Sequence, residues 1–580
     1  MSNITRIPYT GSDGVKSTAA MVPVEVSLEG LTHDDLQVVG HLASAMDTIA
    51  PIFAQQNYKD MIPLLRTVTE LEALSTGEDR NRLSAFATIL DIANSPFGHI
   101  GSLSYADDIF ARHPISLASF EDVLAPGAKR NPKAGVYPTD MTDAEFDALP
   151  AELQMIENST VVRDADGSLR VCVNEDRFSM ELASARASLH AARPYARDQR
   201  LVNLIDAKIS ELRTGSKESR VNADIAWVKN QGKIDFIYST ALETYIDEYK
   251  SIRGCAQGGV FVVNQTYDTI TQQLRDLIPQ WRENAPWDRS KDGVSDIPQL
   301  RFVDVVRWGG GYDLFPGTVS AESLPNDTEV ATKHGRVNLI FVNVQQAKAK
   351  GGSEGAEIAE FLPRDAQHLA PMLRPMYLRM VAAHELGHSI GPVVPEDDWK
   401  REFGADGHVL EEGRAEIFSQ WSLPSMRRAG LITADEELAG HYEMVLTCVR
   451  ALSRTPKNHD AARNMMIHRY LETGAVREIE EDGRKKYTID IDRMKTTVTD
   501  FLAEFDTLKA NLNGDGFRAL KEQYCRTDRH AEFKERFSKF PTACGLIFPD
   551  LVRDEKGLFT GELRYPATFR EQSRSLSRVL

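Results

Sequence analysis

Cysteine is scarce in this sequence, and the few cysteines fit no common framework. The 580 residues include 5 cysteines, an odd number, which stand far apart and form no CxxC pair. This spacing excludes a disulfide-stapled fold and a cysteine-based zinc knuckle. Scattered thiols are typical of reduced side chains, so we expect a cytoplasmic protein.

Long hydrophobic runs and an excess of basic charge are also missing. The first residues, MSNITRIPYTGSDGVKS, contain no apolar stretch of the kind found in secretory signals. The longest apolar runs, such as residues 339–342, are far shorter than a membrane span. The formal net charge is −17 at pH 7, which disfavours phosphate backbones as partners. We therefore expect no membrane and no nucleic-acid partner, and the sequence contains no signal for an oligomeric state.

What is present is the composition of an ordinary globular protein, with 42% hydrophobic and 26% charged residues. In the first half, Thr32 can cap a helix and Thr142 opens another with a capping box. Residues 178–215 have helical spacing interrupted at Pro194, whereas residues 233–264 contain β-rich runs. This half therefore mixes helices with strands.

The second half starts with strands and then becomes helical. Residues 300–345 combine strand-like runs with Gly and Pro turns, and residues 375–530 are mostly helical in pattern. One hairpin is predicted in REIEEDGRKKYTIDI, with Asp482 and Gly483 at its tip. The tail after Pro541 returns to short strands, so the fold class that we predict is α+β.

The strongest chemical signal is HELGH, which stands inside the apolar segment RPMYLRMVAAHELGHSIGP. Pro375 fits the first turn of a helix there, and Gly391-Pro392 is a stop signal. On a helix His384 and His388 share one face, so both imidazoles can reach one ion. Glu385 lies beside them, where it can take a proton from a water molecule that zinc activates. The apolar surroundings favour a buried metal site over a solvated helix face.

A third metal ligand has to come from elsewhere in the chain. A metzincin would continue HxxGxxH, but position 394 is valine, so that class is excluded. The segment LEEGRAEIFSQWSL at 410–423 offers glutamates at helical spacing, so one can bind the metal while another contacts a ligand histidine. His408 is the rival ligand, in what GADG predicts to be a turn.

These motifs resemble those of the dipeptidyl peptidase III family of zinc metallopeptidases. That family pairs an HExxxH helix with an EExRAE or EExRAD helix, and here the second motif is EEGRAE at 411–416. Four further segments are similar to the family in the same order, so the resemblance spans about residues 135–475: PTDMTDAEF (138–146), LETYIDEY (242–249), SLPNDTEVATKHGRVNLIFVN (323–343) and HDAARNMMIHRYLETGA (459–475).

The resemblance implies two lobes around a cleft, a mostly helical zinc-bearing lobe and a mixed lobe with a β core. We expect residues 1–264 to form the mixed lobe and residues 265–535 the helical catalytic lobe, with residues 536–580 returning to the mixed lobe. The implied activity is release of dipeptides from the N-terminus of short peptides, with one zinc ion per chain.

The resemblance also implies roles for particular residues. Glu412 would be the third zinc ligand, with Glu411 and Glu416 orienting the histidines. Glu243 and Asn326 would hold the amino terminus of the substrate. The remaining implied residues are Tyr245 and His459 near the scissile carbonyl and Arg463 as a substrate-side cation. His459 follows Asn458, a good N-cap residue, and a helix N-terminus favours a neutral imidazole that can donate to an oxyanion.

Two departures from the family pattern bear on function. The metal motif is one residue shorter than HExxxH, a spacing that needs no helix bulge to align the histidines but affects the pose of Glu385. Ser323 stands where the family often has an asparagine that binds the substrate amino group. Two other functions stay open: a zinc hydrolase of the same scaffold that cleaves a non-peptide amide or ester, and a non-catalytic, zinc-stabilised peptide-binding protein. A structural zinc site usually has four protein ligands, which favours catalysis here.

Overall fold

The chain folds into two compact units. The computed structural model describes residues 5–10, 16–98, 101–102, 105–288, 290, 299–313, 319–352, 354–404, 406–540 and 543–579. Unit 1 comprises Met1–Asn264, Phe302–Gly352 and Pro541–Leu580, and unit 2 comprises Gln265–Arg301 and Ser353–Phe540. Unit 1 combines sheets with helices and unit 2 is mostly helical, so the predicted α+β class is confirmed. Within the described residues, no helix is both long and apolar enough to cross a bilayer.

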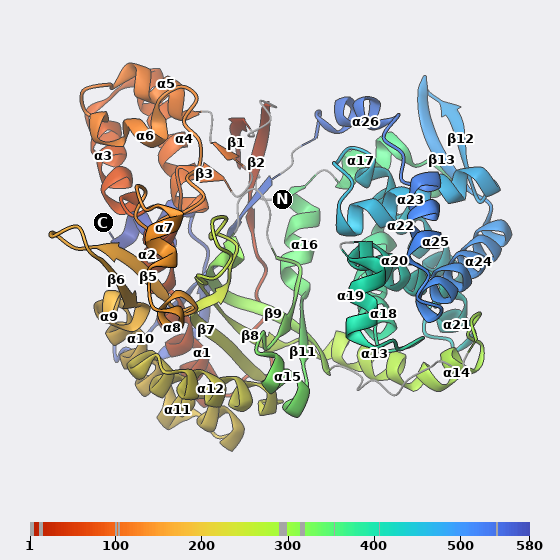
Figure 1. Cartoon of the computed structure of the whole chain (residues 1–580), viewed down its shortest axis with the longest axis horizontal. Helices are drawn as coiled ribbons and strands as arrows, with labels where there is room; N and C mark the ends of the chain where they lie inside the picture. The colour runs from red at the N-terminus through yellow and green to blue at the C-terminus, as the bar shows by residue number, and fades with distance from the viewer. Residues whose placement is uncertain are drawn as a thin grey trace. The chain divides into compact units, whose positions relative to one another are not determined.

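The largest sheet of unit 1 has five strands in the order β10-β11-β9-β8-β7 (Figure 1). The pairs β7–β8, β8–β9 and β10–β11 are antiparallel. The β-rich runs of residues 233–264 and 300–345 therefore form strands, as predicted. The strands are β7 (Ile234–Glu243), β8 (Cys255–Val263), β9 (Gln299–Gly310), β10 (Ala321–Leu324) and β11 (Val337–Phe341).

The unit boundaries differ from the division expected from the sequence mainly in one segment. Residues 265–535 were expected to belong to the helical lobe, whereas Phe302–Gly352 belongs to unit 1. The reason is strand pairing: β9 aligns with β8 from Val303 opposite Val263 to Gly310 opposite Gln257. Long-range pairing of this kind leaves no local signal in the sequence.

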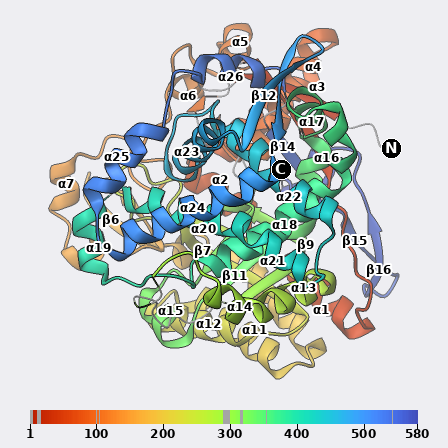
Figure 2. The same cartoon turned by 90° about the vertical axis from the view of Figure 1, so that its right-hand side faces the viewer.

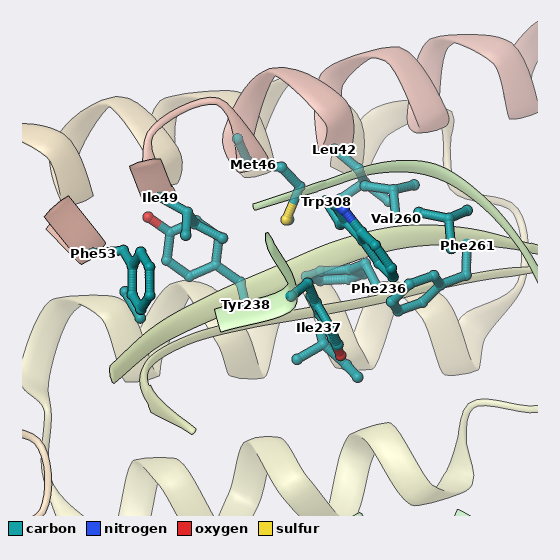
Figure 3. Packing of buried hydrophobic residues seen from close by; sticks show 14 of the residues in the cluster. Leu42, Met46, Ile49, Phe53, Phe236, Ile237, Tyr238, Val260, Phe261 and Trp308 are labelled. Carbon is teal, nitrogen blue, oxygen red and sulfur yellow. The ribbon is translucent and has the colours of Figure 1, made fainter. Parts of the chain in front are cut away.

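Two N-terminal helices cover one face of this sheet (Figure 3). They are α1 (His33–Met46) and α2 (Ile49–Asn57), which contribute the buried side chains Leu42, Met46, Ile49 and Phe53. Side chains alternate along β7, so Tyr238 points toward the helices and Ile237 toward the opposite face. The Tyr238 hydroxyl lies 2.7 Å from Thr48 Oγ1, between the two helices.

Glycines in the strands allow the helices to come this close. A Cβ atom on Gly258 would lie 2.4 Å from Ile49 Cδ1, and one on Gly310 would lie 2.7 Å from Ile49 Cγ2. Any larger residue at these positions would push α2 away from the sheet.

The first and last segments of the chain meet in unit 1. A three-stranded sheet has the order β1-β2-β14, with β14 parallel to β2. Buried Gln37 of α1 also pairs through its amide with the backbone N–H and carbonyl of Phe559, at 3.0 and 2.8 Å. The three strands are β1 (Thr5–Thr10), β2 (Lys16–Pro23) and β14 (Ala543–Ile547). A separate antiparallel pair is formed by β15 (Asp550–Arg553) and β16 (Phe559–Arg564).

Helices of unit 1 begin where the capping patterns predict. The Thr32 hydroxyl accepts from the N–H of Asp35, and the Asp35 carboxylate accepts from the N–H of Thr32. The same reciprocal pair joins Thr142 to Glu145 at the start of α7. The predicted interruption at Pro194 is confirmed, because it separates α10 from α11. The remaining helices of unit 1 are α3 (Met61–Leu74), α4 (Gly77–Ala93), α5 (Tyr105–Arg112), α6 (Glu121–Leu124), α7 (Asp143–Asp147), α8 (Ala151–Gln154), α9 (Asn174–Arg177), α10 (Ser179–Ala192), α11 (Gln199–Thr214), α12 (Lys217–Lys229), α15 (Thr328–His334), α16 (Val342–Gly351) and α27 (Leu576–Val579). Unit 1 also contains two short hairpins, one formed by β3 (Phe97–Gly98) with β4 (Gly101–Ser102) and one by β5 (Ser159–Arg163) with β6 (Leu169–Val173).

Unit 2 is built around four packed helices, α18, α20, α22 and α23, which lie together in both views (Figures 1 and 2). Helix α24 also packs against α20 and α23. The helices are α13 (Gln265–Asp276), α14 (Ile278–Glu283), α17 (Glu354–Phe361), α18 (Ala370–Gly387), α19 (Glu396–Phe403), α20 (Asp406–Trp421), α21 (Leu423–Arg428), α22 (Ala434–Ala451), α23 (Asn458–Thr473), α24 (Ile491–Ala510), α25 (Gly514–Tyr524) and α26 (His530–Phe537).

The predicted hairpin of unit 2 is confirmed. Strand β12 (Val476–Glu481) pairs with β13 (Arg484–Ile489) across Asp482 and Gly483. Both turn residues have positive φ, 56° and 69°, as a two-residue type I′ turn requires.

Candidate metal centre

Helix α18 carries the HExxH motif at its C-terminal end. His384 and Glu385 lie in its last turn, and His388 is the capping residue, still in helical conformation at φ −57° and ψ −28°. The N–H of His388 donates to the His384 carbonyl at 3.2 Å. The two imidazoles therefore stand one turn apart on one face. The C-terminal end of a helix favours positive charge, which suits a bound cation.

The bounds of α18 differ from those expected from proline and glycine. Pro375 was expected in the first turn, but the helix begins at Ala370 and Pro375 lies inside it; it ends at Gly387, before Gly391. Proline removes one helical hydrogen bond, and burial of neighbours such as Leu373 offsets this loss.

Helix α20 supplies the third donor because it packs very closely on its neighbours. A Cβ atom on Gly387 of α18 would lie 2.7 Å from Phe418 Cδ1. A Cβ atom on Gly413 of α20 would lie 2.7 Å from Phe505 Cε1 of α24 and 3.0 Å from Ala462 Cβ of α23. The two glycines thus set the spacing that brings α20 to the histidines.

Three donor atoms converge between α18 and α20. The Nε2 atoms of His384 and His388 are 3.1 Å apart, and Glu412 Oε2 lies 3.3 and 3.7 Å from them. A tetrahedral zinc ion with bonds of about 2.0–2.1 Å requires donors about 3.3 Å apart, so the spacing fits. Glu412 Oε2 is buried and accepts no hydrogen bond within the described chain, as expected of a ligand atom. In the described residues, these three form the one group of converging metal-type donors.

Glu411 holds the ring of His388 in place. Its Oε1 atom lies 3.0 Å from His388 Nδ1, and its carboxylate also accepts from Arg414 Nη2 at 3.0 Å and Lys509 Nζ at 2.7 Å. Because Nδ1 donates to this carboxylate, the lone pair of Nε2 is left facing the other donors, which is the tautomer that binds metal. Burial alone would raise the pKa of Glu411, but Arg414 and Lys509 hold the pKa well below its usual range.

Arg414 links the two helices that carry the candidate metal donors. It is fully buried and donates to the carbonyls of Gly387 at 2.5 Å and Ile390 at 2.7 Å. These carbonyls lie at and beyond the end of α18, where no helical donor reaches them. Asp506 of α24 lies 3.6 Å from the Arg414 guanidinium and is itself fully buried. Sequence reasoning assigned no role to Arg414, Lys509 or Asp506; Arg414 stands inside EEGRAE, whereas Lys509 and Asp506 come from about 100 residues away.

A second layer of groups lies beside Glu412. His459 Nδ1 is 3.4 Å from Glu412 Oε2 and 3.6 Å from Glu416 Oε1. Glu416 accepts from Arg463 Nε at 2.9 Å and also from Arg463 Nη2. Glu416 therefore contacts Arg463 and His459, whereas the family resemblance implies contact with the ligand histidines. Helix α23 begins at Asn458, with Lys457 at the capping position, so His459 is the second residue of the helix.

The charges at the site attract a cation. Burial alone would lower the pKa of His384, but Glu412, Glu416 and Glu385 raise it. Burial alone would raise the pKa of Glu412, yet the three histidines lower it to about 2. Glu412 is therefore a carboxylate anion at neutral pH. The acidic groups around His384 favour an added positive charge at the site. Glu385 follows His384 directly and is half-buried.

His408, the rival ligand, is not part of this group. It was expected in a turn, but it lies in the first turn of α20 and is exposed. His408 lies on the same helix as Glu412, one turn earlier. Among the described residues, however, the converging donor atoms belong to His384, His388 and Glu412 and not to His408.

The residues expected to bind the substrate amino group lie in unit 1. Asn326 Nδ2 donates to Glu243 Oε1 at 2.8 Å and to the Leu242 carbonyl at 2.9 Å. Glu243 Oε2 and Asn326 Oδ1 accept no hydrogen bond from the described residues. Burial raises the pKa of Glu243, and Asn326 opposes this effect. Tyr245 follows shortly after the end of β7, and Ser323 is an exposed residue of β10. The structure thus joins Glu243 to Asn326 in unit 1 and gathers His384, His388, Glu412 and His459 in unit 2.

Comparison with known proteins gives the same classification as the motifs. The sequence model of peptidase family M49 matches residues 141–403, a range that includes HELGH. Dipeptidyl peptidase 3 of Nematostella vectensis is 23% identical over 403 residues, which is 59% of this chain and 53% of that protein, so the chain spans about half of that relative's length. Nudix hydrolase 3 of Arabidopsis thaliana is 21% identical over 549 residues, or 87% of this chain and 69% of that protein.

Two solved structures share the fold. The structure of DPP III from Caldithrix abyssi has a TM-score of 0.76 at 18% identity, covering 91% of this chain and 97% of that one. The structure of dipeptidyl-peptidase III from Corallococcus sp. strain EGB has a TM-score of 0.67 at 17% identity, covering 91% and 95%. These likenesses show that the chain has the fold of the two dipeptidyl peptidase III structures. Residues 141–403 are thus similar to peptidase family M49, and the chain resembles a dipeptidyl peptidase 3 in sequence.

Proposed function

We propose that this chain is a zinc metallopeptidase that releases dipeptides from the N-terminus of short peptides, with one zinc ion per chain. The observation that carries the proposal is the convergence of His384 Nε2, His388 Nε2 and Glu412 Oε2, with Glu385 adjacent on α18. Three protein donors leave a coordination position for water or substrate, which is typical of catalytic zinc. The scattered cysteines support a cytoplasmic location.

In this proposal the protein groups have separate tasks. Bound zinc would supply Lewis acidity, polarising the scissile carbonyl and lowering the pKa of a water molecule. Glu385 would take the proton from that water and pass it to the leaving amine. Glu411 keeps His388 in the tautomer that binds metal. His459 and Tyr245 would donate to the oxyanion that develops on the carbonyl.

Recognition of the substrate terminus is assigned to Glu243 and Asn326. An enzyme that releases dipeptides must position its substrate by the free α-ammonium group. Asn326 Nδ2 donates to Glu243 Oε1, so Glu243 Oε2 and Asn326 Oδ1 would be the atoms that accept from the ammonium group. A carboxylate and an amide oxygen side by side form charge-assisted hydrogen bonds with an ammonium group. Arg463 is paired with Glu416, so we expect it to act on the substrate through that pair.

The test compares a free pentapeptide with its Nα-acetylated twin, with products identified by mass spectrometry. Wild type should release the first two residues of the free peptide. Acetylation removes the charge that Glu243 binds and should lower kcat/KM by about tens to thousands of fold. Glu243→Gln should remove most of this preference, whereas Glu152→Gln, an exposed glutamate of α8, should retain it.

Other outcomes identify the competing functions. Equal cleavage of both peptides, or internal cuts, would contradict the dipeptidyl assignment and leave a zinc hydrolase of another specificity. Substitution of the family's asparagine by Ser323 is the feature that favours a shifted specificity. Zinc-dependent peptide binding without any product would indicate a non-catalytic peptide-binding protein.

A further inference from the structure

Unit 2 contains a cavity that no residue of the metal centre lines. Its volume is about 280 Å³, near the lower end of the range for small-molecule sites, about 300–1,000 Å³. The walls come from α14, α20, α21, α22 and α24. The polar groups and the charges of these walls indicate what the cavity binds.

One polar side chain of the cavity is buried without a partner. His441 of α22 is only 1% exposed, and its Nδ1 lies 2.9 Å from Gln420 Nε2. Gln420 Oε1 accepts from the Tyr470 hydroxyl at 2.6 Å, so the amide nitrogen is the atom that donates to His441. The imidazole proton therefore sits on Nε2. This atom is buried and makes no hydrogen bond within the described chain.

The unpaired Nε2–H is a neutral donor. Burial lowers the pKa of His441 to about 4, with Lys495 acting in the same direction and Glu437 opposing it. A buried donor without an acceptor destabilises the folded protein, so such atoms usually have a protein, water or ligand partner. An acceptor placed in the cavity would satisfy it.

The charged groups of the lining are both basic. They are Arg428 of α21 and Lys495 of α24, and the lining includes no acidic residue. Arg428 is exposed and makes no ion pair within the described chain. Lys495 pairs with Glu437 at 3.0 Å, but Arg427 binds the same carboxylate at 2.8 Å, so positive charge remains in excess. In a chain with a net charge of −17, this local excess favours an anion.

Two tryptophans provide the apolar part of the lining. Trp281 donates its Nε1–H to Ser425 Oγ at 2.5 Å, so its polar atom is satisfied inside the protein. Trp421 packs against Phe418 with ring centroids 5.5 Å apart. Indole rings offer flat surfaces on which a flat apolar group can pack.

We propose that this cavity is a second small-molecule site, which binds a small organic carboxylate with a flat apolar body. The carboxylate accepts the Nε2–H of His441 and is neutralised by Arg428 and Lys495. The apolar body packs against Trp281 and Trp421. This site is separate from the peptide chemistry proposed for the metal centre and stands whether or not that chemistry is correct.

The probe is indole-3-acetate, titrated by calorimetry into the zinc-loaded full chain, with indole-3-acetamide as its uncharged twin. The acid should bind at least about tenfold more tightly than the amide, because the amide lacks the charge that the cations neutralise. The double variant Arg428→Gln/Lys495→Gln should weaken binding of the acid about tenfold. Arg477→Gln, which removes an exposed arginine of β12 outside the cavity, should leave binding unchanged.

His441→Leu tests the buried donor. Its circular dichroism spectrum shows whether the variant is folded, and the folded variant should bind the acid more weakly than wild type. Absence of saturable binding, equal affinity for acid and amide, or affinity for the acid that survives loss of both cations would overturn the proposal. The last outcome would place the carboxylate on the zinc ion instead.

Discussion

At the scale of single residues, the metal centre depends on a few polar atoms whose partners are set by packing. His384 and His388 offer Nε2 atoms 3.1 Å apart, an arrangement that is unfavourable unless a proton or a metal ion lies between them. Glu411 fixes the ring of one of them through Nδ1. Two predictions follow from these contacts, one for Glu385 and one for Glu411.

Glu385→Gln keeps the shape of the side chain and removes its basicity. We expect the variant to bind zinc normally and to lose turnover by about 100- to 10,000-fold, the usual contribution of general acid–base catalysis. Stopped assays with the free pentapeptide measure turnover, and elemental analysis of the same sample checks its metal. A variant that keeps near-normal turnover would refute the role of Glu385 in activating water.

Glu411→Gln removes the negative charge that His388 Nδ1 faces. Carboxylates that bind ligand histidines in this way typically contribute 10–100-fold to metal affinity, so we expect zinc to bind about 10–100-fold more weakly. Competition with a chromogenic chelator measures this affinity. Glu480→Gln, an exposed glutamate of β12, is the matched control and should not change it. Unchanged zinc affinity in a folded Glu411→Gln protein would show that the contact does not support the site.

At the scale of helices and strands, most of the correct predictions came from local signals, although the signals at Pro375 and His408 were misleading. The helix cap at Thr32, the capping box at Thr142 and the turn at Asp482 are encoded within a few residues, so they were predicted correctly. Strand β9 pairs with β8, and this pairing places residues 302–352 in unit 1. No residue near β9 in the sequence indicates that β8 is its partner.

The same distinction applies to the site. The four-residue spacing of His384 and His388 is a local property, and so is the glutamate pair that follows on α20. Arg414 and Lys509 act across helices, the second from about 100 residues away, so the sequence held no sign of their contacts. Glu416 also binds Arg463, a contact that only packing decides, and its role in orienting the ligand histidines stays a prediction.

The close contact of α20 with α23 and α24 can be tested at Gly413. Gly413→Ala places a Cβ atom 2.7 Å from Phe505 Cε1, and we expect overpacking to lower the free energy of unfolding by about 1–3 kcal/mol. Gly355→Ala in α17 is the control, because its Cβ atom would have no neighbour within 4 Å and alanine favours helix. Urea unfolding of the metal-free proteins measures both effects. Equal midpoints for Gly413→Ala and wild type would mean that α20 can shift without cost.

At the scale of the whole molecule, the stability should depend on pH through buried acids. Glu322 of β10 accepts from the Tyr312 hydroxyl and from Gln257 Nε2 at 2.8 Å. Burial, reinforced by Glu243, raises the pKa of Glu322 to about 8. The folded state therefore keeps a proton that the unfolded state loses near its usual pKa of about 4.5.

Because the folded-state pKa is raised, the stability from Glu322 is fully present below about pH 4.5 and is lost as the pH rises toward 8. One such group changes the free energy of unfolding by at most about 1.4 kcal/mol per pH unit. We expect Glu322→Gln, which mimics the neutral acid, to flatten the decline in urea midpoint between pH 5 and pH 8. Glu562→Gln, an exposed residue of β16, should leave the decline as in wild type. A steeper or unchanged decline in Glu322→Gln would contradict the assigned pKa.

The proposed function as a whole depends on one zinc ion that would bind between α18 and α20 of unit 2. Elemental analysis of purified protein, after saturation with zinc and removal of the excess, measures that ion directly. Wild type should contain about one zinc per chain, as a mononuclear HExxH site requires. Glu412→Ala should lose most of it and His408→Ala should keep it. Zinc that stays at full occupancy in Glu412→Ala, or that disappears in His408→Ala, would contradict the assignment of His384, His388 and Glu412 as the metal ligands.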